Sequence, residues 1–106
     1  MSPRPLGYAT VAVLQALADG HRYGFDVIDR TGLPSGTVYP ALATLTARGL
    51  VKSRWEDGTV AHEEGRPRRR YYALTEVGAV ALDEARRRLQ SLGLAGPSRA
   101  ADPEPA

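Results

Sequence analysis

The fold of this chain is decided by the stretch from residue 35 to residue 55, SGTVYPALATLTARGLVKSRW. Its apolar pattern changes at Gly49. The apolar residues before this glycine follow the i, i+4, i+7 spacing of one helix face, at Val38, Leu42 and Leu45. Residues 50–55 alternate with period two, as a half-buried strand does. The stretch therefore predicts a helix that ends at Gly49 and a strand that follows at once.

The start of this helix is set by Ser35 and Pro40. A serine is a favoured N-cap residue, because its hydroxyl can accept a hydrogen bond from a free amide of the first turn. A proline lacks the backbone N–H and is tolerated only close to the start of a helix. The helix is therefore expected to begin close to Ser35.

Two further helices are expected upstream. In residues 6–18 the spacing of Tyr8, Val11, Leu14 and Ala18 predicts one core-facing stripe, widened by Val13 and Leu17, and Gly20 is placed to end the helix. Residues 23–31 predict a shorter helix with Phe25 and Ile28 on its inner side and Val27 as a further candidate there.

A hairpin and a last helix are expected downstream. Residues 70–75 form a second strand rich in aromatic residues, and residues 56–69 between the strands show no apolar period, which predicts a long mobile tip. Cross-strand packing is expected of Trp55, Tyr71 and Tyr72. Thr75 can cap a helix over residues 76–92.

Composition limits the chemistry. The 106 residues carry 14 Lys+Arg against 12 Asp+Glu, and no cysteine. Thiolate catalysis and cysteine-ligated metals are thus excluded, and a reducing compartment fits. No stretch is long and apolar enough to span a membrane, and residues 1–5 have no signal-peptide run, so a cytoplasmic protein is expected.

Catalytic motifs are missing as well. The sequence contains no Gly-x-Ser-x-Gly, phosphate-cradling loop or dinucleotide fingerprint. His62-Glu63-Glu64 lies on a glycine-rich loop without the helical spacing of a zinc pair. No enzyme activity, cofactor or metal is therefore expected.

Three helices, a hairpin and a final helix is the order of a winged helix-turn-helix, mainly α with a β-hairpin. Two motifs then carry a resemblance: Gly36-Thr37-Val38-Tyr39-Pro40 and, at hairpin distance, Tyr71-Tyr72-Ala73-Leu74-Thr75. Together they resemble the PadR family of bacterial transcriptional regulators. The resemblance covers about residues 6–92. It implies a homodimeric repressor that binds double-stranded DNA and is often released from it by a stress signal or by a small-molecule inducer, whose identity the sequence does not give.

The residues agree with DNA binding. Free amides and hydroxyls at the start of the third helix suit phosphate oxygens, and the arginines after the tip suit the DNA backbone. The expected DNA-binding residues are Ser35, Gly36, Thr37, Tyr39, Thr44, Arg68 and Arg69. Two alternatives remain open for Arg70: it contacts DNA, or it pairs with Glu56 across the hairpin. The rival interpretation is a winged helix that binds a protein and has no sequence-specific DNA binding.

The last helix is expected to make a dimer. Its seam is spaced three, four and three residues apart, at Leu82, Ala85, Leu89 and Leu92. Val77 and Ala81 are expected to pack back on the winged domain. The chain is thus divided into a lead (1–5), a DNA-binding domain (6–75), a dimerisation helix (76–92) and a disordered tail (93–106).

Overall fold

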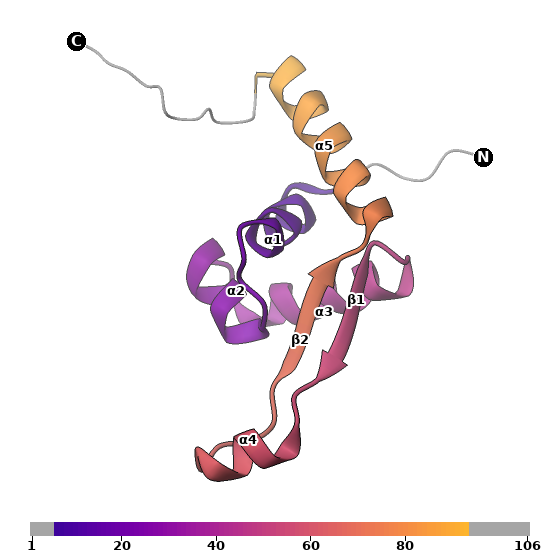
Figure 1. The fold of residues 1–106 in the computed structure, drawn as a ribbon. Coiled ribbons are helices and arrows are strands. Elements are labelled where there is room, and N and C mark those ends of the chain that lie inside the picture. The colour runs from indigo at the N-terminus through magenta and orange to yellow at the C-terminus, as the bar shows by residue number, and fades with distance from the viewer. Residues whose placement is uncertain (1–5, 94–106) are drawn as a thin grey trace.

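The computed structural model describes residues 6–93, so the lead 1–5 and the tail beyond Gly93 lie outside the described residues. The elements follow in the order α1 (Tyr8–Ala18), α2 (Gly24–Thr31), α3 (Ser35–Ala47), β1 (Val51–Trp55), α4 (Gly58–Glu63), β2 (Arg70–Leu74) and α5 (Glu76–Ser91). The first three helices form a body from which the hairpin and α5 extend (Figure 1). The expected mainly helical fold with a β-hairpin is confirmed.

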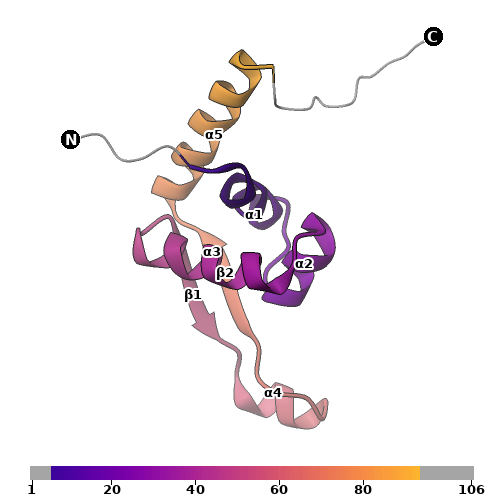
Figure 2. The same ribbon diagram turned by 180° about the vertical axis from the view of Figure 1, so that it is seen from behind.

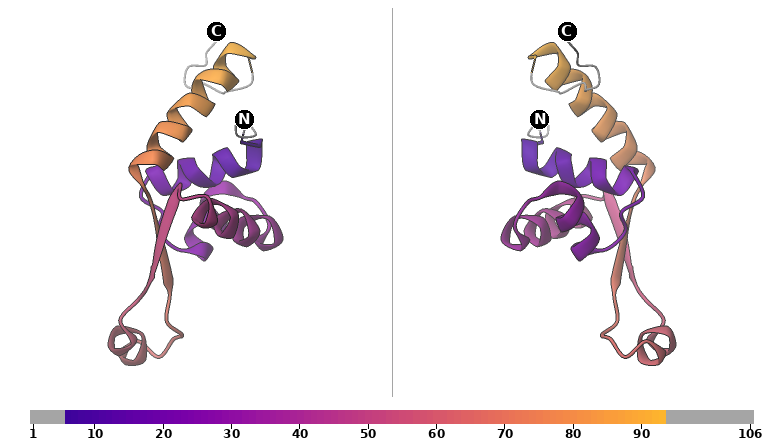
Figure 3. Two further views of the ribbon diagram at one scale, coloured as in Figure 1. Left: turned by 90° about the vertical axis from the view of Figure 1, so that its right-hand side faces the viewer. Right: turned by 90° about the vertical axis from the view of Figure 1, so that its left-hand side faces the viewer.

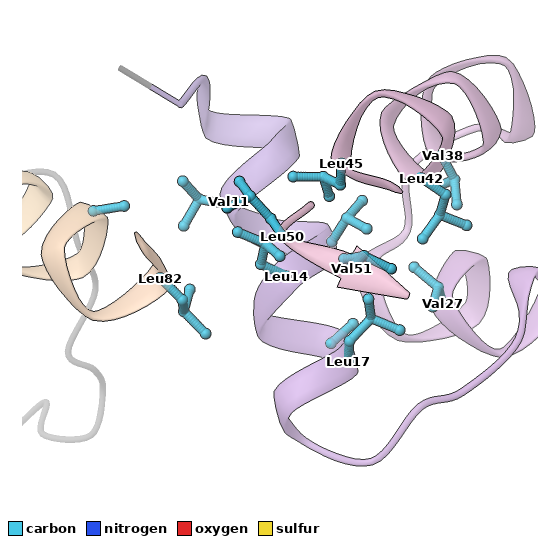
Figure 4. Close-up of a cluster of buried hydrophobic side chains, with 13 residues drawn as sticks. Val11, Leu14, Leu17, Val27, Val38, Leu42, Leu45, Leu50, Val51 and Leu82 are labelled. Atoms are coloured by element: carbon cyan, nitrogen blue, oxygen red, sulfur yellow. The ribbon is translucent and has the colours of Figure 1, made fainter. Parts of the chain in front are cut away.

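The body forms around the helix stripe that the sequence predicted. Val38, Leu42 and Leu45 of α3 are fully buried, and α3 crosses in front of the hairpin when the molecule is seen from behind (Figure 2). Side chains from all three helices, from β1 and from α5 meet in one cluster (Figure 4). This cluster fixes how α3 and the hairpin sit relative to each other.

Three details of the helices differ from the expectations. Tyr8 and Phe25 are 70% and 72% exposed, although both were expected to face the core. In α1 the expected Val11, Val13, Leu14 and Leu17 are buried, but Ala18 is exposed, and in α2 Val27 is buried. The third helix does begin at Ser35, but Pro34 is its N-cap and no side chain caps it.

The two strands are antiparallel, with Val51 opposite Leu74 and Trp55 opposite Arg70. The segment before α2 adds to the free edge of β2. There Tyr72 N–H donates to the Arg22 carbonyl at 2.7 Å, and Tyr23 forms a bridge with Tyr71. The hairpin is thus tied to the helical body along β2, at Tyr71 and Tyr72.

The hairpin tip was expected to be long and mobile, and no helix was predicted in it. It contains the six-residue helix α4, whose first turn is capped by Asp57 accepting the Thr59 N–H at 2.8 Å. Ala61 is the buried side chain of α4. One buried residue in six positions is too little to produce a helical period in the sequence.

The expected cap of α5 is confirmed, because Thr75 Oγ1 accepts the Gly78 N–H at 3.0 Å. Gly78 lies directly against the Leu50 carbonyl, leaving no room for a side chain. From this junction α5 and the hairpin run to opposite ends of the molecule (Figure 3). None of the helices within residues 6–93 is long and apolar enough to cross a lipid bilayer.

Candidate nucleic-acid interface

The first turn of α3 is an open helix end. Thr37 and Val38 N–H both donate to the Pro34 carbonyl, at 2.9 and 3.0 Å. The amides of Ser35 and Gly36 precede them and have no intrahelical acceptor, and no side chain caps this end. Such an end carries partial positive charge and can donate hydrogen bonds to an anion.

Gly36 is exposed, and a Cβ built on it would meet no atom of the protein within 4 Å. The fold itself therefore does not require a glycine at this position. Its effect is to leave the helix backbone bare toward the outside, so that another molecule can approach it closely.

The exposed side of α3 agrees in part with the residues expected to bind DNA. Tyr39 and Thr44 are exposed, whereas Thr37 is half-buried and the neighbouring Ala41 packs against the core. Of the expected residues on α3, the structure brings Ser35, Gly36 and Tyr39 together at one end and places Thr44 further along the same helix.

Tyr39 is held in place by α2. Its ring and hydroxyl lie on the backbone of Gly24, where a Cβ would overlap them. The ring still remains 42% exposed, because its other side faces outward. Tyr39 thus presents a fixed aromatic surface beside the open end of α3.

The arginines of the hairpin lie over different aromatic rings. The guanidinium groups of Arg68 and Arg70 both lie over the Trp55 ring, at 5.5 Å from its centroid. The guanidinium of Arg69 lies over Tyr23 instead, at 4.2 Å. The expected pair Arg68 and Arg69 thus contacts two different rings, although both residues line one groove.

Arg70 does not pair with Glu56, which corrects one of the two alternatives. Its Nε and Nη2 donate to Ser53 Oγ at 3.1 and 2.9 Å. Glu56 is taken by Arg66, through two hydrogen bonds of 2.7 Å. These hydrogen bonds lower the pKa of Glu56 to about 2 and raise that of Arg66. Arg66 is therefore neutralised within the hairpin.

A second group of cations surrounds Tyr71 on the face that carries Arg69. Arg22 and Arg54 lie over the Tyr71 ring at 5.3 and 5.0 Å, and Tyr71 meets Tyr23 edge to face. The sequence analysis missed both arginines, since Arg22 is distant in sequence and Arg54 stands alone in a strand. The signal that could have found Arg54 is its cross-strand position opposite Tyr71.

The start of α2 adds one hydrogen-bonded pair of side chains beside this group. His21 Nδ1 and Asp26 Oδ1 are 2.9 Å apart, and the hydrogen bond from His21 is the main cause of the lowered pKa of Asp26. Arg22 N–H also donates to the same carboxylate, at 3.3 Å. The pair fixes the turn that carries Arg22.

The N-terminal part of α3, the start of α2 and the hairpin line one groove of about 620 Å³. Tyr39, Phe25 and Gly24 form its helical wall, and Trp55 with Arg68 and Arg70 forms the wall of the hairpin. Phe25 was expected in the core and is found here. The groove therefore combines cations, exposed aromatic rings and a nearby helix end, as a surface for nucleic acid does.

The tip beyond this groove has the opposite charge. Asp57, Glu63 and Glu64 are all exposed there, and of these Glu64 pairs with Arg66 at 2.8 Å. Cations lie along the stem of the hairpin, between the tip and the body. Within residues 6–93 no three His, Asp or Glu side chains are grouped to hold a metal ion.

The expected dimer seam is divided between two environments. Leu82 and Ala85 are only 3% and 1% exposed and pack into the core of their own chain. Leu89 is half-buried, and Leu92 is 62% exposed. Ala81 packs on the core as expected, but Val77 is exposed, so that expectation was wrong. The apolar stripe of α5 is longer than the body that covers it.

An open end of a third helix beside a cationic hairpin defines a winged-helix protein of the DNA-binding class. The model of the PadR-like family of transcriptional regulators matches residues 13–84. The chain belongs to this family, whose members are transcriptional regulators and not enzymes. The resemblance inferred from the two motifs is thereby confirmed.

Solved structures agree with this assignment. A PadR family regulator from Clostridium difficile R20291 is 25% identical, with a TM-score of 0.71 over 82% of this chain and 92% of that one. A PadR-like regulator from Bacillus cereus has a TM-score of 0.64 at 19% identity, over 79% and 82% of the two chains. BpsR of Bordetella bronchiseptica, whose DNA binding is regulated by 6-hydroxynicotinic acid, has a TM-score of 0.70 at 21% identity, over 95% and 74%. No relative was found among the curated proteins.

Proposed function

We propose that this protein is a cytoplasmic repressor that binds an inverted-repeat operator in double-stranded DNA as a homodimer. The start of α3 enters the major groove, and the stem of the wing, which is the hairpin of β1 and β2, binds the phosphates beside it. The observation that carries the proposal is the groove, which is lined by Tyr39 from the second turn of α3 and by Arg68 and Arg70 of the hairpin.

The roles of the α3 residues follow from their chemistry. The amides of Ser35 and Gly36 donate to a phosphate oxygen, and Tyr39 donates its hydroxyl from a fixed ring. Thr44, further along the exposed side, and the half-buried Thr37 supply hydroxyls. Few of these groups read base edges, so phosphate contacts and DNA shape contribute much of the affinity.

The dimer is proposed to form through the far half of α5. Leu89 and Leu92 continue the stripe beyond the body and would be covered by the same residues of a partner chain. A twofold axis there makes the contact self-complementary. It also presents two α3 helices to half-sites about 34 Å apart, which is one turn of DNA.

The proposal includes a small-molecule inducer of unknown identity. Its support is the family and the structural likeness to BpsR, whose DNA binding a small aromatic acid regulates. Inducer binding would shift the protein toward a conformation with lower affinity for DNA.

Selection from a pool of random duplexes, combined with light scattering, tests the function. We expect an enriched inverted repeat with half-sites one helical turn apart, and a particle mass of two chains. A pool that stays unenriched, with no salt-dependent shift of any duplex, would favour a winged helix that binds a protein.

A further inference from the structure

Glu56 is the one charged side chain that is buried among residues 6–93, with 5% of its surface exposed. It is the first residue after β1, on a hairpin proposed to bind a polyanion. A buried carboxylate is costly unless it is fully hydrogen-bonded, so its surroundings determine what it does there.

The carboxylate of Glu56 accepts four hydrogen bonds. Two come from the fork of Arg66 at 2.7 Å each, one from Arg69 N–H at 3.1 Å and one from the Tyr71 hydroxyl at 3.3 Å. Its main chain adds two more: Glu56 N–H donates to the Arg69 carbonyl at 2.7 Å, and its own carbonyl accepts from Arg68 Nε at 3.1 Å. All six lead to the returning half of the hairpin.

These bonds close the tip. Glu56 and Arg66 clamp the ends of the segment that holds α4, and in all views this segment stands away from the helical body (Figures 1 to 3). Packing against the body therefore does not order the tip, and the clamp does so in its place. A bidentate pair of this kind fixes both distance and orientation.

The clamp also determines which arginines are free to bind DNA. Arg66 forms salt bridges with Glu56 and Glu64, so its charge is already compensated. Arg68 is aligned by its bond to the Glu56 carbonyl and then extends over Trp55. Arg69 is aligned through its amide and extends over Tyr23. The hydrogen bonds from Arg68 Nε and Arg69 N–H to Glu56 therefore determine the orientation of both arginine side chains.

We propose that Glu56 is the positioning residue of the wing: with Arg66 it holds Arg68 and Arg69 in place for the DNA backbone. This inference rests on the proposed function. It has an unusual consequence, because removal of an acid from a DNA-binding surface ordinarily strengthens binding by making the protein more positive. Removal of this acid weakens binding.

The experiment compares Glu56→Gln with Glu63→Gln. Both variants remove one negative charge from the wing, but Glu63 is exposed on α4. Duplex affinity and its salt dependence are measured by fluorescence anisotropy, with the folded fraction checked by circular dichroism. We expect Glu63→Gln to bind as tightly as the native protein or more tightly. We expect Glu56→Gln to bind about tenfold more weakly near 0.1 M salt for each phosphate that the wing ceases to bind, with a shallower salt slope.

Two further variants show that the pair itself is responsible. Arg66→Lys keeps the charge but removes the fork, and should weaken binding if orientation matters. The double change Glu56→Gln with Arg66→Gln should cost less than the sum of its single changes, because both break one interaction. Arg66→Lys also keeps the test open if Glu56→Gln fails to fold, since Arg66 lies outside the core cluster.

The possible outcomes are distinguishable. Equal affinities and salt slopes for Glu56→Gln, Arg66→Lys and Glu63→Gln at equal folded fractions would overturn the positioning role and leave the proposed function intact. A native protein that binds no duplex would overturn the proposed function. A decrease in affinity that follows the folded fraction alone, with an unchanged salt slope, would show that Glu56 only stabilises the fold.

Discussion

Replacing Gly78 with alanine sets helix propensity against packing. Gly78 is the third residue of α5, and alanine is favoured over glycine within a helix by up to about 1 kcal/mol. Propensity alone therefore predicts a more stable protein.

The packing predicts the opposite. A Cβ on Gly78 would overlap the Leu50 carbonyl oxygen and lie 2.9 Å from its carbonyl carbon. That oxygen belongs to the backbone and already accepts the Thr75 N–H at 3.1 Å, so it cannot move aside as a side-chain end does. Overpacking costs about 1 to 3 kcal/mol, and an overlap with a backbone atom puts this site in the upper part of that range, at about 2 to 3 kcal/mol. After the propensity gain of up to about 1 kcal/mol, a net loss of about 1 to 2 kcal/mol remains.

Urea unfolding followed by circular dichroism measures this decrease in stability. With a slope of about 1 kcal/mol per molar urea, the midpoint should fall by about 1 to 2 M. Samples are compared at equal protein concentration, because the proposed dimer would make stability depend on it. The control is Gly36→Ala, in the first turn of α3, where a Cβ meets open space. A Gly78→Ala protein as stable as the native one would refute the close packing of α5 on the Leu50 carbonyl.

Three other predictions concern the interface, the tip and the dimer. Gly36→Ala should leave the unfolding midpoint unchanged or higher while lowering duplex affinity, and unaltered affinity in a titration would remove Gly36 from the DNA contact. Because the pKa of Glu56 is lowered from 4.5 to about 2, its contribution to wing order is complete above pH 4.5 and is lost as pH falls from there toward 2. Fluorescence of the adjacent Trp55 should follow this transition, and a change attributable to Glu56 centred above pH 4.5 would contradict it. Leu92→Glu, on a side chain 62% exposed, should halve the mass seen by light scattering and leave the fold intact; an undiminished mass would place the dimer contact elsewhere.

The fold could be predicted from the sequence as far as its periodicities reach. Val38, Leu42 and Leu45 recur every three or four residues and all are buried. Thr75 was recognisable as a cap because capping needs only one hydroxyl at one position. Tyr8 and Phe25 failed the same reasoning, since a large apolar residue at a helix edge satisfies the spacing whether it faces the core or solvent.

The interface was harder to predict, because pairing decides which charges are free. A run of four arginines with two acids upstream does not reveal that Glu56 takes Arg66 and leaves Arg70 to Ser53. Nor does it reveal that the guanidinium groups of Arg68 and Arg69 lie over different aromatic rings. In α5 the spacing correctly predicted one apolar stripe. It could not predict which residues of the stripe the helical body covers, because that depends on how the whole chain packs.

The salt dependence of duplex affinity tests the central claim most directly, namely that the wing stem and the start of α3 bind DNA. The dissociation constant is measured from about 50 to about 200 mM salt for the native protein, Arg68→Gln and the control Arg87→Gln. Arg87 is an exposed cation on α5, paired with Asp83 at 3.0 Å. The account predicts that Arg68→Gln weakens binding to every duplex and reduces the magnitude of the log–log slope by about 1.8 in a dimer, while Arg87→Gln matches the native protein. Equal slopes for all three proteins, or affinity that does not respond to salt, would contradict it.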